Sequence, residues 1–441
     1  MESSFARTSH SAYPPSRRDD APETRAFLRA ALRKHGVAGT SIGVLDGASI
    51  TTLCAGTAAR GSPMAPDTWL QQASLSKTIA AAFMITYFRG KGVDPLRTPV
   101  VDVLARLSSP FRLVCAPGVP ERFLRELMLS HLVNHTGLGL HYVPGVPPSR
   151  SGGFPPVLEL LQGQHEAELR YPHIMLEKRP GTKFAYSGAG FMLLQHILEL
   201  EHGGRPIADI LAPWLVQCGV HGHDLGFDQV DPARGAAETP VTIAHGYRED
   251  GSPVTDTRLM FPPLAAGAHG SPQALCRFLY HLARAYRMPA GTKSGPIPHE
   301  TARTMLDNAV DMGAFDFMHS RMGLGVFVTL VGPNRFMLHQ AANDGFRGVF
   351  FVCFDGPDAG RGFVLLSNGD NNAMFMNCEL CRALLKRLRV EGMDWSALNL
   401  GGDGGFDTTG LKQEEIVNLG IKQLVLEACV QPGSKGTISR L

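Results

Sequence analysis

Strand-forming segments occur near both ends of this chain, whereas helix-forming segments fill the middle. Near the start, residues 40–45 and 50–54 are β-prone and are joined by an Asp-Gly turn, which predicts a hairpin. Later strands are predicted over residues 325–331, 349–354 and 362–367. Because a sheet must bury its apolar face, strands from the two ends are expected to pair. The order therefore predicts an α+β fold, with an antiparallel sheet built from both chain ends and flanked by helices, plus a mostly helical insertion.

Apolar residues with helical spacing mark the segments that should cover this sheet. The predicted helices span residues 21–34, 74–88, 124–134, 191–200, 273–286 and 373–388, with a weaker pattern over 412–429. We predict a disordered N-terminal arm over residues 1–20, one domain over residues 21–395, and an extension over residues 396–441. The sheet of this domain is expected from about residues 37–72 and 322–370, and the helical insertion from about residues 90–320.

The overall composition argues against two classes of partner. The formal net charge is only +2, and Lys and Arg are not clustered as they are in nucleic-acid-binding proteins. No apolar run reaches the roughly 18 to 20 residues that a membrane-spanning helix needs. We therefore expect no nucleic-acid partner and no membrane span.

The cysteines and the N-terminal residues indicate a reducing compartment. Eight cysteines scattered over 441 residues are far fewer than a disulfide scaffold needs. The first 20 residues lack the apolar stretch of a secretory signal, so we expect a protein that is not secreted. Cys378 and Cys381 form one C-x-x-C, but a zinc ribbon needs a second pair. They are interpreted as part of a helix face, and neither a metal nor a cofactor is expected.

Ser74 and Lys77 form an S-x-x-K motif at the start of a predicted helix. Residues three apart lie on the same side of a helix, which places the lysine one turn from the serine. A serine hydroxyl becomes a good nucleophile only when a neighbouring group accepts its proton, and a lysine among apolar residues can be shifted toward neutrality. The spacing alone fits equally a helix-capping serine followed by a surface lysine.

Further motifs follow in order downstream. Residues 130–138 read SHLVNHTGL, residues 180–190 read PGTKFAYSGAG, and residues 339–347 read HQAANDGFR. Together with S-x-x-K, these motifs resemble the class C β-lactamase-like family, which is related to penicillin-binding proteins and includes the S12 serine peptidases and esterases. The resemblance extends from about residue 37 to about residue 371 and implies a β-lactamase/transpeptidase-like fold.

The resemblance implies roles for the matching positions. Ser74 would attack the carbonyl carbon of a substrate and form an acyl-enzyme, with Lys77 keeping the local proton balance favourable. Tyr186 would act as a general base toward Ser74 and later toward water. His339 would assist electrostatically or anchor a substrate carboxylate. The backbone N–H groups of Ser74 and Ala342 would form the oxyanion hole.

Two positions depart from the family pattern, and both bear on the substrate. Gly188 replaces the Asn of Y-x-N, which in the family contacts the substrate amide and helps hold the lysine. Ala341 replaces a Gly, and its methyl group would narrow the approach of the substrate to the strand. Substrate-binding positions are expected at Gly188, Gln340, Ala341 and Asn343, and the departures argue against efficient β-lactam turnover. Residues 134–136 are interpreted as structural, holding the insertion against the site.

These features predict a serine hydrolase that acts on a small ester or amide without a cofactor. Two alternatives stay open at this point. The same acyl-enzyme could pass its acyl group to an alcohol or thiol, which would make the protein an acyltransferase. The changes at Gly188 and Ala341 also fit a non-catalytic binding or filament-forming scaffold. Neither the substrate nor the oligomeric state is encoded in a readable motif.

The chain ends in Ser439, Arg440 and Leu441, one conservative step from the S-K-L peroxisomal address. In a eukaryotic host this tail predicts binding to a peroxisomal import receptor, and hence a location in a peroxisome or peroxisome-like organelle. In any other host we expect a cytoplasmic protein.

Overall fold

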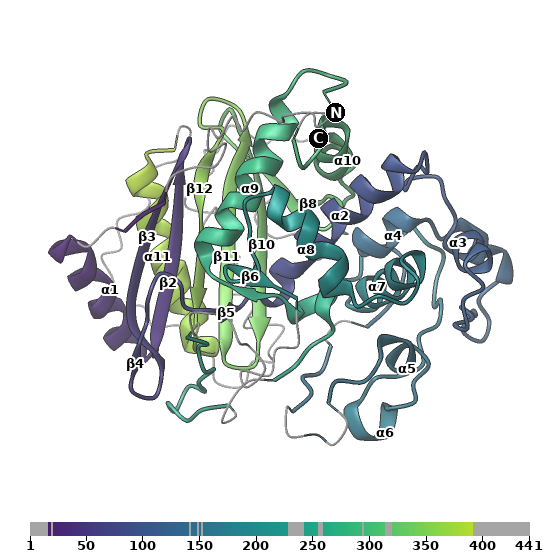
Figure 1. Ribbon diagram of the computed structural model, residues 1–441, viewed down its shortest axis with the longest axis horizontal. Coiled ribbons are helices and arrows are strands. Elements are labelled where there is room, and N and C mark those ends of the chain that lie inside the picture. Colours follow the sequence, from purple (N-terminus) through teal and green to yellow (C-terminus); the bar gives the residue numbers. More distant parts are fainter. Residues whose placement is uncertain are drawn as a thin grey trace, which may run out of the picture.

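The computed structural model describes residues 16–18, 21–140, 143–147, 150, 153–227, 242–254, 259–292, 295–313 and 320–390. Its centre is a nine-stranded sheet in the order β1-β3-β2-β12-β11-β10-β9-β8, with β4 paired to β3 (Figure 1). The strands are β1 (Ser16–Arg18), β2 (Gly39–Asp46), β3 (Ser49–Ala59), β4 (Ser62–Pro63), β8 (Arg321–Met322), β9 (Phe327–Val331), β10 (Asn334–Asn343), β11 (Phe346–Asp355) and β12 (Arg361–Ser367). All of these strand pairs are antiparallel except β1 with β3.

The two ends of the chain meet where β2 pairs with β12, in a register that runs from Thr40 opposite Ser367 to Asp46 opposite Arg361. This pairing confirms the predicted sheet built from both chain ends. Helices cover both faces of the sheet here, so β2 is buried along nearly its whole length. An almost continuous apolar run, without polar alternation, is what such a strand requires.

Strand β1 places residues 16–18 in the sheet, within the arm that was predicted to be disordered over residues 1–20. Ser16–Arg18 pair in parallel with residues 50–52 of β3. Without β1, this side of β3 would be the edge of the sheet, and its unpaired backbone groups attract another strand. Pairing through the backbone needs no apolar pattern, which is why the polar composition of the arm gave no sign of it.

Helices cover the sheet on both faces (Figure 1). One face packs against α1 (Pro22–His35) and α11 (Asn371–Leu388), and the other against α9 (Pro272–Arg287). Beyond α9, α10 (His299–Asp307) contacts both α9 and α2 (Ser76–Gly90). None of the described helices combines the length and the apolar character needed to cross a bilayer.

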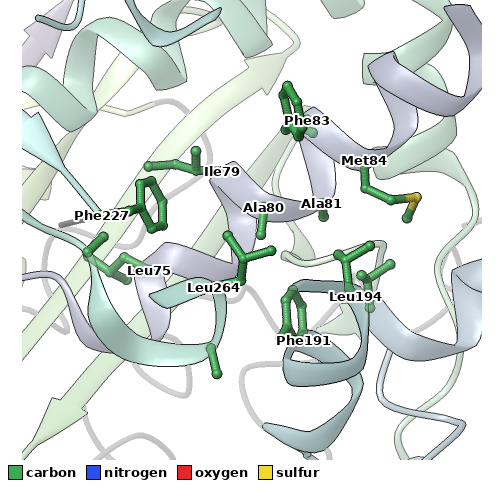
Figure 2. Close-up of a cluster of buried hydrophobic side chains, with 14 of the residues drawn as sticks. Leu75, Ile79, Ala80, Ala81, Phe83, Met84, Phe191, Leu194, Phe227 and Leu264 are labelled. Atoms are coloured by element: carbon green, nitrogen blue, oxygen red, sulfur yellow. The ribbon is translucent and has the colours of Figure 1, made fainter. Parts of the chain in front are cut away.

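The insertion between the two halves of the sheet is mostly helical and lies to one side of it (Figure 1). It contains α3 (Val100–Arg106), α4 (Leu129–Val133), α5 (Val157–Leu161), α6 (Glu166–Leu169), α7 (Ala189–Glu201) and α8 (Ile207–Gln217), with a small sheet of β5 (Leu70–Gln71), β7 (His269–Gly270) and β6 (Leu225–Gly226) nearby. Figure 2 shows Phe191 and Leu194 of α7 facing the buried residues Ala80 and Met84 of α2. This apolar contact holds the insertion against the helix that begins beside Ser74.

The helix predicted over residues 124–134 is wrong in one respect, because the structure divides it. Residues Glu121–Glu126 form the 3₁₀ helix η2, and α4 begins only at Leu129. Between them Met128 is extended and bridges Pro99, while the Val100 N–H donates to the Leu127 carbonyl at 2.8 Å. Tertiary pairing therefore takes the hydrogen bonds that helical spacing would have kept local.

Candidate active site

Ser74 lies in a 3₁₀ turn, η1 (Ala73–Leu75), directly before α2. The α-helix thus begins at Ser76, two residues later than predicted, and Lys77 still follows Ser74 by one turn. No side chain caps η1 or α2, so Ser74 is not a helix cap. Ala73 has a left-handed φ of 45°, a strained conformation for a residue with a Cβ. Such strain persists where the surrounding structure holds a functional side chain in a fixed direction.

Lys77 is buried, at 2% exposure, because α2 is apolar on nearly every side. Its Nζ lies 3.1 Å from Ser74 Oγ and donates to the Ala265 carbonyl at 2.6 Å. The ammonium also lies 5.0 Å from the ring centroid of Tyr186 and 5.5 Å from that of Phe191. Within the described residues no carboxylate compensates it, and burial lowers the pKa of Lys77 to about 7. A large fraction of Lys77 is therefore neutral at neutral pH.

The carbonyl that holds Lys77 belongs to η3 (Pro263–Gly267), a buried π-helical turn that the sequence did not single out. Two contacts to helices fix this turn. The Leu264 N–H donates to Gln195 Oε1 of α7 at 3.5 Å, and the Ala268 N–H donates to Ser76 Oγ of α2 at 3.0 Å. π-Helical turns are rare in proteins as a whole, and those that occur are often found at functional sites. No local sequence pattern predicts one.

Tyr186 lies between His135 of the insertion and His339 of strand β10. Its ring stacks on that of His135, with centroids 4.2 Å apart and planes 28° from parallel. The ring centroid of His339 lies 6.1 Å away on the far side of the site. The structure thus brings Ser74, Lys77, Tyr186 and His339 together in one cluster, although they come from three separate motifs of the sequence.

His339 lies on β10, immediately beyond the part of that strand that pairs with β9. It is buried, and its Nδ1 donates to the Gln340 carbonyl at 2.8 Å. Its Nε2 is then a bare acceptor, with no hydrogen-bond partner in the described part of the chain. Burial, together with the charge of Lys77, lowers the pKa of His339 to about 3. The imidazole is therefore neutral and can accept a hydrogen bond at Nε2, while the anchoring of a substrate carboxylate by His339 stays a prediction.

The edge of β10 beside Ser74 is open along its last residues. β9 pairs only with residues 334–338, and η1 packs beside the remainder of the strand. The turn to β11 pairs Asn343 with Phe346 across two residues, which makes these the hydrogen-bonded pair. Because such pairs alternate along an antiparallel ladder, the Ala342 N–H points away from β11 and toward η1. An oxyanion hole shared with the Ser74 N–H requires this direction.

At Gly188 the structure leaves no room for a side chain. A Cβ added there would come within 2.4 Å of Val143 Cγ1 and 3.8 Å of Ala265 Cβ. Val143 comes from the segment between α4 and α5, and the Gly188 N–H donates to the Leu140 carbonyl of the same segment at 2.8 Å. The isopropyl group of Val143 and the methyl group of Ala265 therefore lie beside the position at which the Y-x-N pattern has Asn.

Two of the expected substrate-binding residues, Ala341 and Asn343, have side chains that are packed against other parts of the protein. Ala341 is buried, and its cross-strand neighbour is Gly348, whose lack of a side chain leaves room for the methyl group. Asn343 Nδ2 donates to Gln71 Oε1 at 2.7 Å and to an η3 carbonyl at 3.2 Å. That nitrogen ties β10 to β5 and η3, and a contact between Asn343 and the substrate stays a prediction. Gln340 is half-buried at the open part of the strand.

The structure also contains a cavity of about 430 Å³. Among the described residues, it is lined by Pro144, Gly145, Pro147, Arg150, Glu168, Leu169 and Arg170. Arg150 and Glu168 form a bidentate ion pair in its wall, with Nε–Oε1 at 2.9 Å and Nη2–Oε2 at 3.2 Å. None of Ser74, Lys77, Tyr186 and His339 is among the described residues that line this cavity.

The remaining predicted sites carry no chemistry that the structure reveals. Cys378 and Cys381 lie on α11, and burial raises the pKa of both thiols, that of Cys378 to about 12. No group of three or more His, Cys, Asp or Glu side chains in the described ranges could hold a metal ion. The helix pattern over residues 412–429 and the tail residues Ser439, Arg440 and Leu441 lie outside the described residues.

Comparison with known proteins points to one family. Residues 24–379 match the family model described as Beta-lactamase. No curated protein matches the sequence. Three solved structures illustrate the likeness in fold. They are an octameric penicillin-binding protein homologue from Pyrococcus abyssi (TM-score 0.59, 16% identity, 84% of this chain and 78% of that one), D-amino acid amidase from Ochrobactrum anthropi SV3 complexed with L-phenylalanine amide (0.58, 19%, 83% and 96%), and a penicillin-binding protein from Bacillus halodurans (0.54, 20%, 78% and 94%). At these identities the likeness shows the fold alone.

Proposed function

The chain belongs to the beta-lactamase family of hydrolases, and from that premise we propose that it is a serine hydrolase in which Ser74 forms an acyl-enzyme with a small ester or amide. One observation carries the proposal. A buried lysine amine, uncompensated by any described carboxylate, lies 3.1 Å from the hydroxyl of Ser74. A serine paired in this way with a group that can accept its proton is the arrangement that activates a nucleophile.

In the proposed acylation step, Ser74 Oγ attacks the carbonyl carbon of the substrate while neutral Lys77 accepts the hydroxyl proton. The carbonyl oxygen becomes an oxyanion, held by the N–H groups of Ser74 and Ala342. The bond to the leaving group then breaks, and the proton returns to that leaving group as an alcohol or amine departs. Tyr186, with its ring beside the Lys77 amine, is the proposed carrier of this proton.

In deacylation, water attacks the acyl carbon of the ester formed on Ser74. The proton of the water passes to the Tyr186–Lys77 pair, and Ser74 Oγ leaves and regains a proton. Because Nε2 of His339 is an open acceptor beside Tyr186, we propose that it orients the phenol hydroxyl without carrying charge.

The apolar side of the site bears on the substrate. Val143 occupies the space of the family Asn that contacts a substrate amide, so an acylamino group next to the scissile carbonyl would find no polar partner there. We therefore propose simple esters as better substrates than β-lactams.

The proposal is tested with a fluorophosphonate probe and intact-mass measurement. We expect one adduct on the wild-type protein, none on Ser74→Ala, and one on the matched control Ser49→Ala, whose exposed hydroxyl donates to the Asp46 carbonyl. A wild-type protein that takes up no probe, or an adduct that survives Ser74→Ala, would overturn the assignment.

A second experiment addresses the substrate class and the acceptor. Short p-nitrophenyl esters, D-amino-acid anilides and a chromogenic cephalosporin are compared by kcat/KM, with and without an added alcohol. Preference for the ester supports the proposal, and equal turnover of the cephalosporin contradicts the substrate class. A transfer product that forms with the alcohol in preference to the free acid would identify an acyltransferase.

A further inference from the structure

His135 lies in the turn after α4, inside the segment that the sequence suggested was structural. Its backbone has a left-handed φ of 60°, a conformation that few residues other than glycine adopt and in which histidine, asparagine and aspartate are enriched. A glycine would form the same turn without strain. The contacts of the imidazole ring are what a glycine at this position would lack.

The ring and backbone of His135 bracket Tyr186. The His135 carbonyl accepts the N–H of Ala185 at 2.8 Å, and His135 Nδ1 accepts the N–H of Ser187 at 3.0 Å. The residues immediately before and after Tyr186 are thus both bound to one histidine, while the Tyr186 ring stacks on its imidazole. Phe184 and Phe191 pack at 5.8 and 5.7 Å from the same ring, so the imidazole is enclosed as well as hydrogen-bonded.

These bonds define the state of the ring. Nδ1 can accept the Ser187 N–H only if it carries no proton, so the imidazole is neutral with its proton on Nε2. A neutral ring also places no positive charge against the Tyr186 phenol or the nearby Lys77 amine. Protonation at Nδ1 would break the bond to Ser187 and release one of the two contacts that hold the tyrosine.

We propose that His135 is a positioning residue for Tyr186, which fixes the height and tilt of the phenol relative to Lys77 and Ser74. The inference rests on the proposed function, because it gives the position of Tyr186 a catalytic purpose. A displacement of about 1 Å in a reacting group lowers rates by about 10²-fold, so small changes in this support should be visible in turnover.

Two substitutions of His135 separate the effect of the stacking ring from that of the hydrogen-bond acceptor. His135→Phe retains a stacking ring and removes the acceptor, whereas His135→Asn suits the left-handed backbone, retains an acceptor and removes the ring. We expect kcat for the best ester to fall by about tenfold or more in both, with KM changed by less than about twofold. The matched control is His202→Phe, because His202 packs a ring against Tyr87, at 4.8 Å, far from Ser74 in the fold. It should alter thermal stability and leave kcat unchanged.

A double-mutant cycle distinguishes positioning from a general structural role. If His135 acts through Tyr186, then His135→Phe should cause little further loss of kcat in a Tyr186→Phe background. Additive losses, or a kcat unchanged in both His135 variants while Tm falls as in the His202 control, would overturn the proposal. Should His135→Phe not fold, His135→Asn with Tyr186→Phe carries the same cycle. Probe labelling of the wild type at Ser74 is measured in parallel, since its absence would refute the proposed function and not the role of His135.

Discussion

Two walls enclose the Ser74 hydroxyl, and they are built in different ways. The first wall, residues 73–77 and 339–343, belongs to regular elements, η1 with α2 and the strand β10. The second wall consists of Val143, the segment from Tyr186 to Gly188, and the turn η3, all of which are irregular. The first wall carries the proposed nucleophile, lysine and oxyanion hole. The second wall decides how well these groups are shielded from water and what space a substrate finds.

Lys77 shows what this difference means. Its distance from Ser74 is a property of one helical turn and could be read from the motif. Its pKa of about 7, in contrast, results from burial, and the carbonyl that receives its hydrogen bond lies 188 residues away in η3. A motif on a regular element thus places the reactive groups, and irregular segments packed against it set their protonation state.

The largest predicted effect on kcat/KM comes from Lys77→Arg, a substitution in the first wall. Arginine carries a permanent positive charge and cannot release a proton at any working pH, so Ser74 loses its proton acceptor. We expect kcat/KM for the best ester to fall about 10³-fold while the protein stays folded by circular dichroism. Lys91→Arg, at the other end of α2, is the matched control and should leave activity unchanged. A loss smaller than about tenfold would mean that another group accepts the proton.

The pH dependence of kcat/KM in the wild type tests whether burial by the second wall lowers the pKa of Lys77. Burial lowers the pKa of Lys77 to about 7, so the lysine is protonated and inactive as a base below that value. We expect kcat/KM to rise about tenfold per pH unit on the acid side and to level off above the pKa. His339, with a pKa lowered to about 3, stays neutral throughout this range. A rise that continues toward the ordinary pKa of lysine would show that the second wall does not neutralise Lys77.

Gly188→Asn is expected to destabilise the protein, because its side chain would overlap with Val143 of the second wall. The new Cβ would meet Val143 Cγ1 at 2.4 Å, and overpacking of this kind lowers the free energy of unfolding by about 1–3 kcal/mol. Combining it with Val143→Ala should recover part of the loss, as measured by urea unfolding of both single variants and the double variant. Gly222→Asn, where an added Cβ meets nothing within 4 Å, is the control. Strictly additive losses would show that the two residues do not share this space.

The smallest effect is predicted for Ala341→Gly in the first wall. Because this methyl group is buried opposite Gly348, its removal should lower the free energy of unfolding by about 1 kcal/mol. We expect kcat/KM to change by less than about threefold in ester assays. A tenfold gain would instead support the earlier expectation that the methyl group narrows the path of the substrate.

The regular elements could be predicted closely, because their periodicity is local. The strand expected over residues 362–367 is Arg361–Ser367, and the helix expected over residues 273–286 is Pro272–Arg287. Strand β10 has no continuous apolar run, because it buries the polar residues His339 and Asn343 at the site. Its existence came only from the resemblance of the motif.

By itself, the sequence determined that strands from the two chain ends pair, that Lys77 follows Ser74 by one turn, and which motifs meet them. Only the tertiary structure decided the hydrogen-bond partner of Lys77, the neutral state of His339, the isopropyl group beside Gly188 and the imidazole beneath Tyr186. The physical reason is that periodicity and spacing act over a few neighbouring residues. Burial, pKa and occupied space depend instead on groups that only the folded chain brings into contact.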